Sequence, residues 1–343
     1  MWRVLGAAVA LGALAAVPMH AAGFGIFEQG SKATGMGGAF TAQADDPSAL
    51  FYNAGGLAFV TKADGSIGFT YIHDTKAELR GANPFPGDGY TAKQKPLTAF
   101  PPHAYYVQPL NSTWKIGLGI ETPFGVTTEW EHPHDFAGRF ISTKAKLEIF
   151  DVNPTIGWQV TPNFGIGIGG IARISDVELN RDIPANNPFT QSIVNAASLK
   201  LKGDFSEGYG FNAGILYKAT PDLSLGLSYR SRITVKYTGD ARLTPLATGN
   251  AQLDAAIAAA LPLNTNLPVK TSIDFPAMAS LGVAYGFSQN LLVEVDANWT
   301  GWSSFKEVPI TFTGGPTNSL PSTSLPQNWK DVYNYRIGLR WQA

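Results

Sequence analysis

Two short stretches of this chain contain residue types that carry out chemistry in other proteins. His132-Pro133-His134-Asp135 places two imidazoles and a carboxylate close together, and all three are metal-ligand types. Gly165-Ile166-Gly167-Ile168-Gly169-Gly170 matches the G-x-G-x-x-G pattern that binds a dinucleotide where a strand leads into a helix. The chain has no cysteine, which excludes disulfides, thiolate catalysis and cysteine-ligated metals.

Neither stretch has the context that its chemistry requires. The histidine cluster is a single short loop without a second group of ligands, and the glycine run continues an alternating strand pattern and opens no helix. His73 and His103 have no Ser or Asp arrangement nearby. We therefore predict no metal, no cofactor and no enzymatic activity. A membrane-embedded lipid hydrolase remains an alternative, because catalytic triads are assembled in space.

The composition points to strands in a membrane as the elements that position these residues. Charged residues make up 15% of the 343 residues, against roughly 25% in ordinary soluble domains, while the chain contains 37 Gly, 20 Phe, 12 Tyr and 8 Trp. Such a chain is typical of a large membrane β-barrel. The formal charge of -1 gives no electrostatic footprint for nucleic acid.

Residues 1–22 have the features of a secretory signal peptide. Arg3 precedes an apolar run that ends at Val17, and small residues follow where a signal peptidase would cut, after Ala21 or Ala22. A retained membrane anchor is the alternative. No later stretch reaches eighteen uninterrupted apolar residues, so an integral protein of this sequence must be a barrel.

Alternation of period two runs through the rest of the chain. From Leu223 to Tyr237 every odd position except Ser231 is apolar or aromatic, and the even positions are small or polar. Such a pattern places one set of side chains on each face of a strand. The same alternation predicts about ten strands, near residues 64–80, 96–109, 113–126, 140–160, 164–180, 199–218, 223–240, 270–286, 291–310 and 330–343.

The connections alternate between two lengths. Short turns lie near 109–112, 161–163, 220–222 and 288–290, and long loops lie near 81–95, 127–139, 181–198, 241–269 and 311–329. Short periplasmic turns and long external loops are the arrangement of outer-membrane barrels. We therefore predict an all-β transmembrane antiparallel barrel at residues 63–343. A soluble sandwich is the alternative, and it would leave wide aromatic faces uncovered.

A glycine-rich stretch at residues 23–62 precedes the first strand and lacks alternation. Its small side chains suit compact packing inside a barrel lumen, and a disordered periplasmic tail is the alternative. The stretch resembles the N-terminal hatch of the FadL/TodX family, outer-membrane transporters of long-chain fatty acids and other hydrophobic compounds. The resemblance covers the whole mature chain, and the residues that carry it here are Gly23, Phe24, Gly35, Gly37, Gly38, Asn53 and Gly56, together with Asp45-Asp46.

Two features depart from the family pattern. The family commonly has Asn-Pro-Ala-Gly-Leu where this chain has Asn53-Ala54-Gly55-Gly56-Leu57, and losing the proline frees a backbone dihedral. The family barrel has fourteen strands, so with about ten the chain resembles a fragment lacking the last four; a smaller closed barrel is the alternative.

The resemblance also implies where a ligand binds. Arg181 and Lys330 correspond to lumen-side basic residues that contact the ligand headgroup, and either could instead be a solvated loop charge. The third and fourth external loops correspond to an outer hydrophobic groove, with Phe189 and Ile193 in one and Leu253, Ile257 and Leu261 at helical spacing in the other. Pro123, Phe124 and Gly125 correspond to a kinked third strand that forms a lateral gate; a plain strand end is the alternative.

These observations predict passive outer-membrane transport of hydrophobic compounds, foremost long-chain fatty acids, through a hatch-plugged barrel with lateral release into the membrane. A monoaromatic hydrocarbon channel, a nonspecific porin and a lipid hydrolase are the alternatives. We expect a monomer that contacts outer-membrane lipid and binds no nucleic acid.

Overall fold

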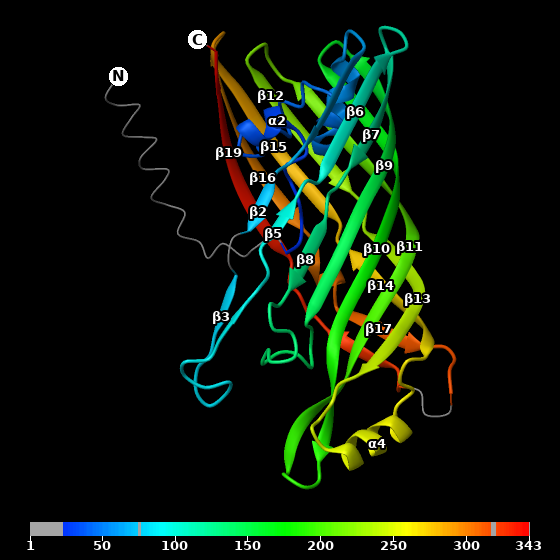
Figure 1. Ribbon diagram of the computed structural model, residues 1–343. Helices are drawn as coiled ribbons and strands as arrows, with labels where there is room; N and C mark the ends of the chain where they lie inside the picture. The colour runs from blue at the N-terminus through cyan, green and yellow to red at the C-terminus, as the bar shows by residue number, and fades with distance from the viewer. Residues whose placement is uncertain (1–22, 75–76, 317–319, 343) are drawn as a thin grey trace.

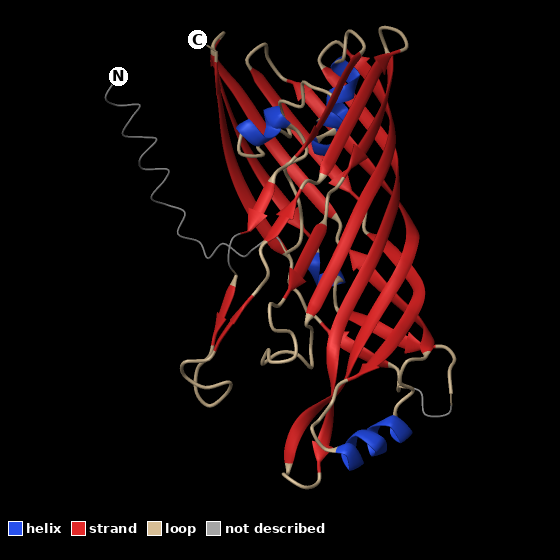
Figure 2. Cartoon of the chain, viewed as in Figure 1, coloured by secondary structure: helices blue, strands red, loops and turns tan. Residues whose placement is uncertain are grey.

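The computed structural model describes residues 23–74, 77–316 and 320–342, so the predicted signal peptide lies outside the described residues. Strands make up most of this part of the chain and run side by side as a tall, tilted wall (Figures 1 and 2). The all-β prediction is therefore confirmed. No helix in the described ranges is both long and apolar enough to span a bilayer.

Consecutive antiparallel pairing builds the main sheet, in which ten of the described strands follow one another along a single hydrogen-bonded path. They are β1 (Asp64–Phe69), β6 (Pro102–Pro109), β7 (Trp114–Glu121), β9 (Lys144–Thr161), β10 (Phe164–Asn187), β11 (Ser192–Lys218), β12 (Leu223–Arg230), β15 (Met278–Ser288), β16 (Leu291–Thr300) and β19 (Val332–Trp341).

Other described strands extend this sheet or stand apart from it. The main sheet also contains β8 (Gly125–Glu129), β13 (Ile233–Pro245), β14 (Asn266–Phe275), β17 (Glu307–Phe312) and β18 (Thr323–Pro326). Two small ribbons pair β2 (Ile72–Asp74) with β5 (Leu97–Ala99), and β3 (Glu78–Arg80) with β4 (Thr91–Lys93). The helical elements are α2 (Ser31–Gly35), α3 (Ala49–Tyr52), η1 (Ala54–Phe59), α4 (Ala251–Ala260) and η2 (Trp302–Ser304).

The predicted strand count of about ten was wrong, because the main sheet has 15 strands in the described residues. Several predicted spans are divided in two. The span at 113–126 is interrupted around Pro123, and the span at 270–286 is divided at Pro276, with β14 before the proline and β15 after it. Proline lacks the N–H that a central strand donates, so each proline ends a run of pairing.

The predicted loop at 181–198 was also wrong. β10 and β11 continue as a paired ribbon through most of it and leave only a tight turn between Asn187 and Ser192. Pro184 is accommodated at a register shift next to Ile183, where its missing N–H is tolerated. Polar residues on an exposed ribbon look like a loop in the sequence, because no apolar alternation marks them.

Large apolar side chains face outward in a continuous band near the end of the sheet that carries the short turns. On β9 the band runs from Phe150 to Trp158, and on β11 from Tyr209 to Tyr217. Beyond it, toward the long loops, the outward side chains become charged, beginning with Glu148 on β9. The band is close to the roughly 9–11 residues that a tilted strand needs within lipid.

Glycines on the inner wall make room for residues 23–62. A Cβ on Gly117 of β7 would lie 2.6 Å from Leu50 Cδ2, and a Cβ on Gly165 of β10 would lie 2.5 Å from Ala58 Cβ. Small residues are therefore required where the segment touches the wall. The G-x-G-x-x-G pattern reflects this packing and no helix follows it, as the alternation indicated.

Candidate functional site

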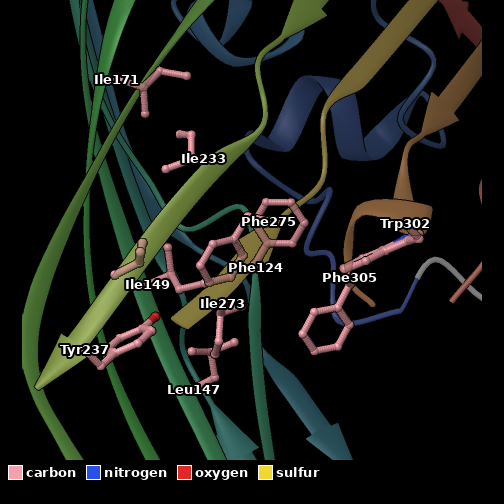
Figure 3. Close-up of a cluster of buried hydrophobic side chains, with 11 residues drawn as sticks. Phe124, Leu147, Ile149, Ile171, Ile233, Tyr237, Ile273, Phe275, Trp302 and Phe305 are labelled. Carbon is pink, nitrogen blue, oxygen red and sulfur yellow. The ribbon is translucent and has the colours of Figure 1, made fainter. Parts of the chain in front are cut away.

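The inner face of the sheet encloses an apolar cavity of about 400 Å³ on the long-loop side of the N-terminal segment. Its walls come from strands β8, β9, β10, β11, β13, β14, β17 and β18, from the stretch before β19 and from the start of the N-terminal segment. Figure 3 shows a buried apolar cluster that includes four of the lining residues, Leu147, Tyr237, Ile273 and Phe305. The apolar lining residues are Phe24, Val126, Ala145, Leu147, Val177, Leu179, Leu201, Tyr237, Val269, Ile273, Phe305, Val308, Ile310, Leu325 and Trp329. A cavity of this size and lining is suited to a small hydrophobic molecule.

Tyr237 reaches the cavity because the strand pattern changes phase. The alternation predicted that the odd positions from Leu223 to Tyr237 share one face of a strand. In the structure Leu227 and Tyr229 are exposed on the outside, whereas Val235 and Tyr237 are buried inside. The change falls at the interruption between β12 and β13. A one-residue slip exchanges the faces of every later side chain.

Phe24 of the N-terminal segment lies at one end of the cavity inside a cage of aromatic rings. Its ring centroid is 4.7 Å from that of Trp302, and four more rings surround it in edge or tilted contacts. They are Phe124 at 5.9 Å, Phe275 at 6.2 Å, Phe305 at 5.7 Å and Trp329 at 5.6 Å. These partners are far apart in the sequence, so the sequence analysis missed the cage.

The wall is interrupted beside Phe24, between Glu121 at the end of β7 and Gly125 at the start of β8. The N-terminal segment pairs with this interruption, because Ile26 N donates to Pro123 O at 2.8 Å and Gly125 N donates to Phe24 O at 3.0 Å. A second cavity of about 690 Å³ lies at the interruption, and Phe24 lines both cavities. Gly23, Val126, Lys146 and Leu147 also line both cavities, so the predicted gate at Pro123 to Gly125 lies beside the boundary that the two cavities share.

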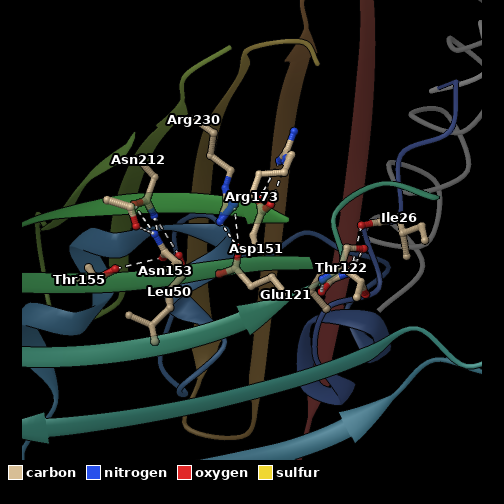
Figure 4. Close-up of polar contacts among 12 residues, drawn as sticks. Ile26, Leu50, Glu121, Thr122, Asp151, Asn153, Thr155, Arg173, Asn212 and Arg230 are labelled. Carbon is tan, nitrogen blue, oxygen red and sulfur yellow. Dashed lines mark hydrogen bonds and ion pairs between the residues drawn. The ribbon is translucent and has the colours of Figure 1, made fainter. Parts of the chain in front are cut away.

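Two buried ion pairs cross the inner wall near the interruption (Figure 4). Arg173 Nη2 donates to Asp151 Oδ2 at 2.7 Å, and its guanidinium lies 4.9 Å from the Phe124 ring centroid. Arg230, the last residue of β12, pairs with Glu121, the last residue of β7. The Arg230–Glu121 ion pair therefore connects the ends of β7 and β12 across the interior.

The two predicted headgroup residues do not lie at equivalent places. Arg181 on β10 is in register with Leu199 of β11, which is fully buried, and lies two residues beyond the cavity residue Leu179 on the same face. Its Nε is buried without a hydrogen-bond partner among the described residues. Lys330 is exposed in the stretch before β19, next to Trp329. Neither basic residue lines the cavity directly.

The external residues form a separate patch beside α4. The helix was predicted from the spacing of its leucine and isoleucine, but Leu253 and Ile257 are buried against Ala196 of β11, and Leu261 follows as the C-cap residue, partly buried. Phe189 and Ile193, at the tip of the β10–β11 ribbon, are 61% and 60% exposed. Only the ribbon residues of the predicted groove are therefore open to solvent.

The glycines predicted for the N-terminal segment lie at its turns and contacts. Gly23, Gly37 and Gly38 have φ values of 63°, 63° and 76°, which an L-residue rarely adopts. Gly35 ends α2, and Gly56 lies in η1 beneath Ala44. In addition, Asn53 caps η1 by accepting from Gly55 N at 2.9 Å.

The histidine cluster has no metal-binding partners. In the described ranges no group of three or more His, Cys, Asp or Glu side chains could hold a metal ion. His134 Nδ1 instead contacts the buried carboxylate of Asp182 at 3.0 Å, which ties the loop to the outer end of β10.

Known proteins share the sequence and fold features described above. Residues 12–343 match the family described as "Outer membrane protein transport protein (OMPP1/FadL/TodX)". The long-chain fatty acid transport protein of Escherichia coli O6:H1 is 24% identical over 354 residues, which cover 95% of this chain and 75% of that protein. Outer membrane protein P1 of Haemophilus influenzae is 22% identical, covering 88% and 70%.

Two solved structures show the same fold. A FadL homologue of Pseudomonas aeruginosa superimposes with a TM-score of 0.73 at 24% identity, covering 94% of this chain and 78% of that one. The toluene transporter TbuX of Ralstonia pickettii superimposes with a TM-score of 0.69 at 19% identity, covering 92% and 84%.

Proposed function

Because this chain belongs to the OMPP1/FadL/TodX family, and is thus an outer-membrane transporter of hydrophobic compounds and not an enzyme, we propose that it carries long-chain fatty acids. The observation that carries this choice is the position of Arg181. Its guanidinium Nε has no hydrogen-bond partner among the described residues, and the residue lies just beyond a mainly apolar cavity. An alkyl chain would fill the cavity and its carboxylate would meet Arg181, whose fork of donors suits that group.

The route follows from the contacts of Phe24. We infer that residues 23–62 form a hatch, and that Phe24 keeps the lumen cavity apart from the cavity at the β7–β8 interruption. A ligand that displaces Phe24 would join the two cavities and reach the wall opening at Pro123 to Gly125. The interruption lies level with the outer edge of the apolar band, since Glu121 is in register with Asp151, next to Phe150. Transport would thus be passive, driven by concentration and by affinity for lipid.

Monoaromatic hydrocarbons are the second candidate. The cage around Phe24 would accept an aromatic ring in place of the phenylalanine, with the same edge-to-face geometry. This candidate needs no cation, so Arg181 separates the two.

The test is saturable binding of a fluorescent long-chain fatty acid to the refolded protein, with toluene as competitor. Loss of a charged hydrogen bond should make Arg181→Ala bind about tenfold to a hundredfold more weakly. The exposed Lys330→Ala should have a smaller effect, and Lys236→Ala, an exposed lysine of β13, should have none. If Arg181→Ala leaves the fatty-acid affinity unchanged and toluene displaces the fatty acid, the carboxylate site is rejected in favour of the hydrocarbon route.

A further inference from the structure

Two acidic side chains of β16 bind one short stretch of the N-terminal segment. Glu294 and Asp296 are alternate residues, so both point inward, and each is fully buried. Asp296 Oδ2 accepts from Phe40 N at 3.0 Å, from Thr41 N at 3.1 Å and from the Thr41 hydroxyl at 2.7 Å. Glu294 accepts from two backbone N–H groups, Ala42 N at 2.6 Å and Gln43 N at 3.0 Å.

Four consecutive backbone N–H groups, those of residues 40–43, therefore donate hydrogen bonds to two carboxylates. Residues 40–43 follow α2 and belong to no helix or strand, so their buried N–H groups cannot use regular backbone pairing. Carboxylates are the strongest acceptors available for such groups. Two buried acidic side chains on one face of a strand are unfavourable unless donors converge on them, which indicates that the arrangement is specific to this contact.

The same side of the wall adds two further charged contacts. Arg336 Nη1 of β19 donates to Gly38 O at 3.2 Å, and Arg340 Nη1 donates to Asp45 Oδ2 at 3.1 Å. We call residues 38–45, with their charged partners on β16 and β19, the charged latch.

The other end of the segment is held differently. Asn53 Nδ2 donates to Ile215 O of β11 at 2.9 Å, and Leu50 O accepts from Asn212 Nδ2 at 3.0 Å. Close packing of η1 on the glycines of β9 and β10 completes this neutral anchor.

Thr41 and Ala42 of the charged latch also pack closely on Gly226 of β12 and Gly282 of β15, and Asn53 Nδ2 donates to Thr41 O at 2.7 Å. Both ends are therefore closely packed, and the latch adds hydrogen bonds to charged side chains on the wall.

We propose that Glu294 and Asp296 are positioning residues that hold the hatch shut, and that the hatch opens by releasing the charged latch while the neutral anchor stays in place. This rests on residues 23–62 being the hatch and is independent of which hydrophobic compound is carried. Release would uncover the lumen on the side of β16 and β19, next to the short turns that face the periplasm.

The two carboxylates should respond differently to conversion into amides. Glu294 uses both oxygens, so Glu294→Gln forces an NH₂ group against a backbone N–H. Asp296 uses Oδ2 alone, and its Oδ1 has no partner among the described residues. Asp296→Asn can therefore keep its oxygen on the three donors and place its NH₂ where Oδ1 accepts no hydrogen bond.

The experiment measures hatch opening with a single cysteine in this cysteine-free chain. Ala39→Cys introduces a thiol that is buried beside the charged latch, and a membrane-impermeant maleimide labels it only when the latch is released. In proteoliposomes of the full chain, Glu294→Gln should speed labelling by about tenfold or more. Asp296→Asn should change it by less than about threefold, and Glu148→Gln, an exposed acid of β9, should leave it unchanged.

Folding of each variant is checked by heat-dependent gel mobility. If Glu294→Gln does not fold, Thr41→Val decides the question from the hatch side, because it removes the hydroxyl bound to Asp296 and leaves the wall intact. It should speed labelling about two- to fivefold. The proposal is overturned if folded Glu294→Gln is labelled at the parent rate or responds no more than Asp296→Asn. If Glu294→Gln does not fold, labelling of Thr41→Val at the parent rate overturns it. None of these outcomes bears on the fatty-acid binding test above.

Discussion

Removing the Phe24 ring should detach the N-terminal segment from the wall interruption. In Phe24→Ala five aromatic partners lose their common neighbour, and full Phe→Ala truncation in a core costs about 3–5 kcal/mol. Phe24 is only partly buried, so we expect about 2–3 kcal/mol for the docking of this segment. That corresponds to a rise of about 30- to 150-fold in the undocked population.

Amide hydrogen exchange reports this population directly. The Gly125 and Ile26 amides are protected by bonds between the segment and the interruption, so both should exchange about 30- to 150-fold faster in Phe24→Ala. Phe27→Ala is the matched control, since Phe27 lies 4.6 Å from the Arg336 guanidinium and outside the cage. Unchanged protection at Gly125 in Phe24→Ala would refute the view that the cage holds the segment against the wall.

Three further predictions concern stability. Gly167→Ala should lower the free energy of unfolding in urea by about 1–3 kcal/mol, because its Cβ would meet the backbone of Ala54, whereas Gly170→Ala, where no atom lies within 4 Å, should be nearly neutral. Asp151→Ala should cost about 3–5 kcal/mol in the same assay, because it leaves the Arg173 guanidinium buried and unpaired; removing both charges together should cost less. Hydrogen bonds from Thr248 hold the pKa of Asp254 below its usual value. The ionised Asp254 therefore supports α4 above about pH 4, and this support is lost as the pH falls through the lowered pKa. Exchange of the α4 amides should accelerate only in that acidic range, and Asp254→Ala should show no such acceleration.

Alternation in the sequence predicted the strands well where one face is uniformly apolar. It located both ends of β9 and β19 to within four residues, and it placed the first residues of β7, β10, β12 and β16 to within one residue but ran past the ends of β7, β12 and β16. It failed where pairing is polar or shifted, as in the ribbon beyond Arg181 and at the slip after Arg230, because neither feature changes the local residue pattern.

The site was less predictable than the fold. Arg181 was indicated only by the family resemblance, whereas the interruption at Pro123 follows from the missing N–H. The aromatic cage and the carboxylates of β16 could not be predicted, since Phe24 and Phe40 meet partners a hundred or more positions away in the sequence. Glu294 and Asp296 were visible only as polar members of an alternating strand, which is the ordinary pattern for a lumen-facing position.

The length of the β10–β11 ribbon places its exposed apolar tip far from the apolar band. From Tyr209, at the outer end of the apolar band, to Ile193 at the tip is sixteen positions (209 − 193), or about 50 Å of strand and roughly 40 Å of height once tilt is considered. The exposed Phe189 and Ile193 therefore sample the aqueous medium well above the head groups. A poorly soluble molecule caught there would descend along the protein and would not have to cross the polar surface layer of the membrane unaided.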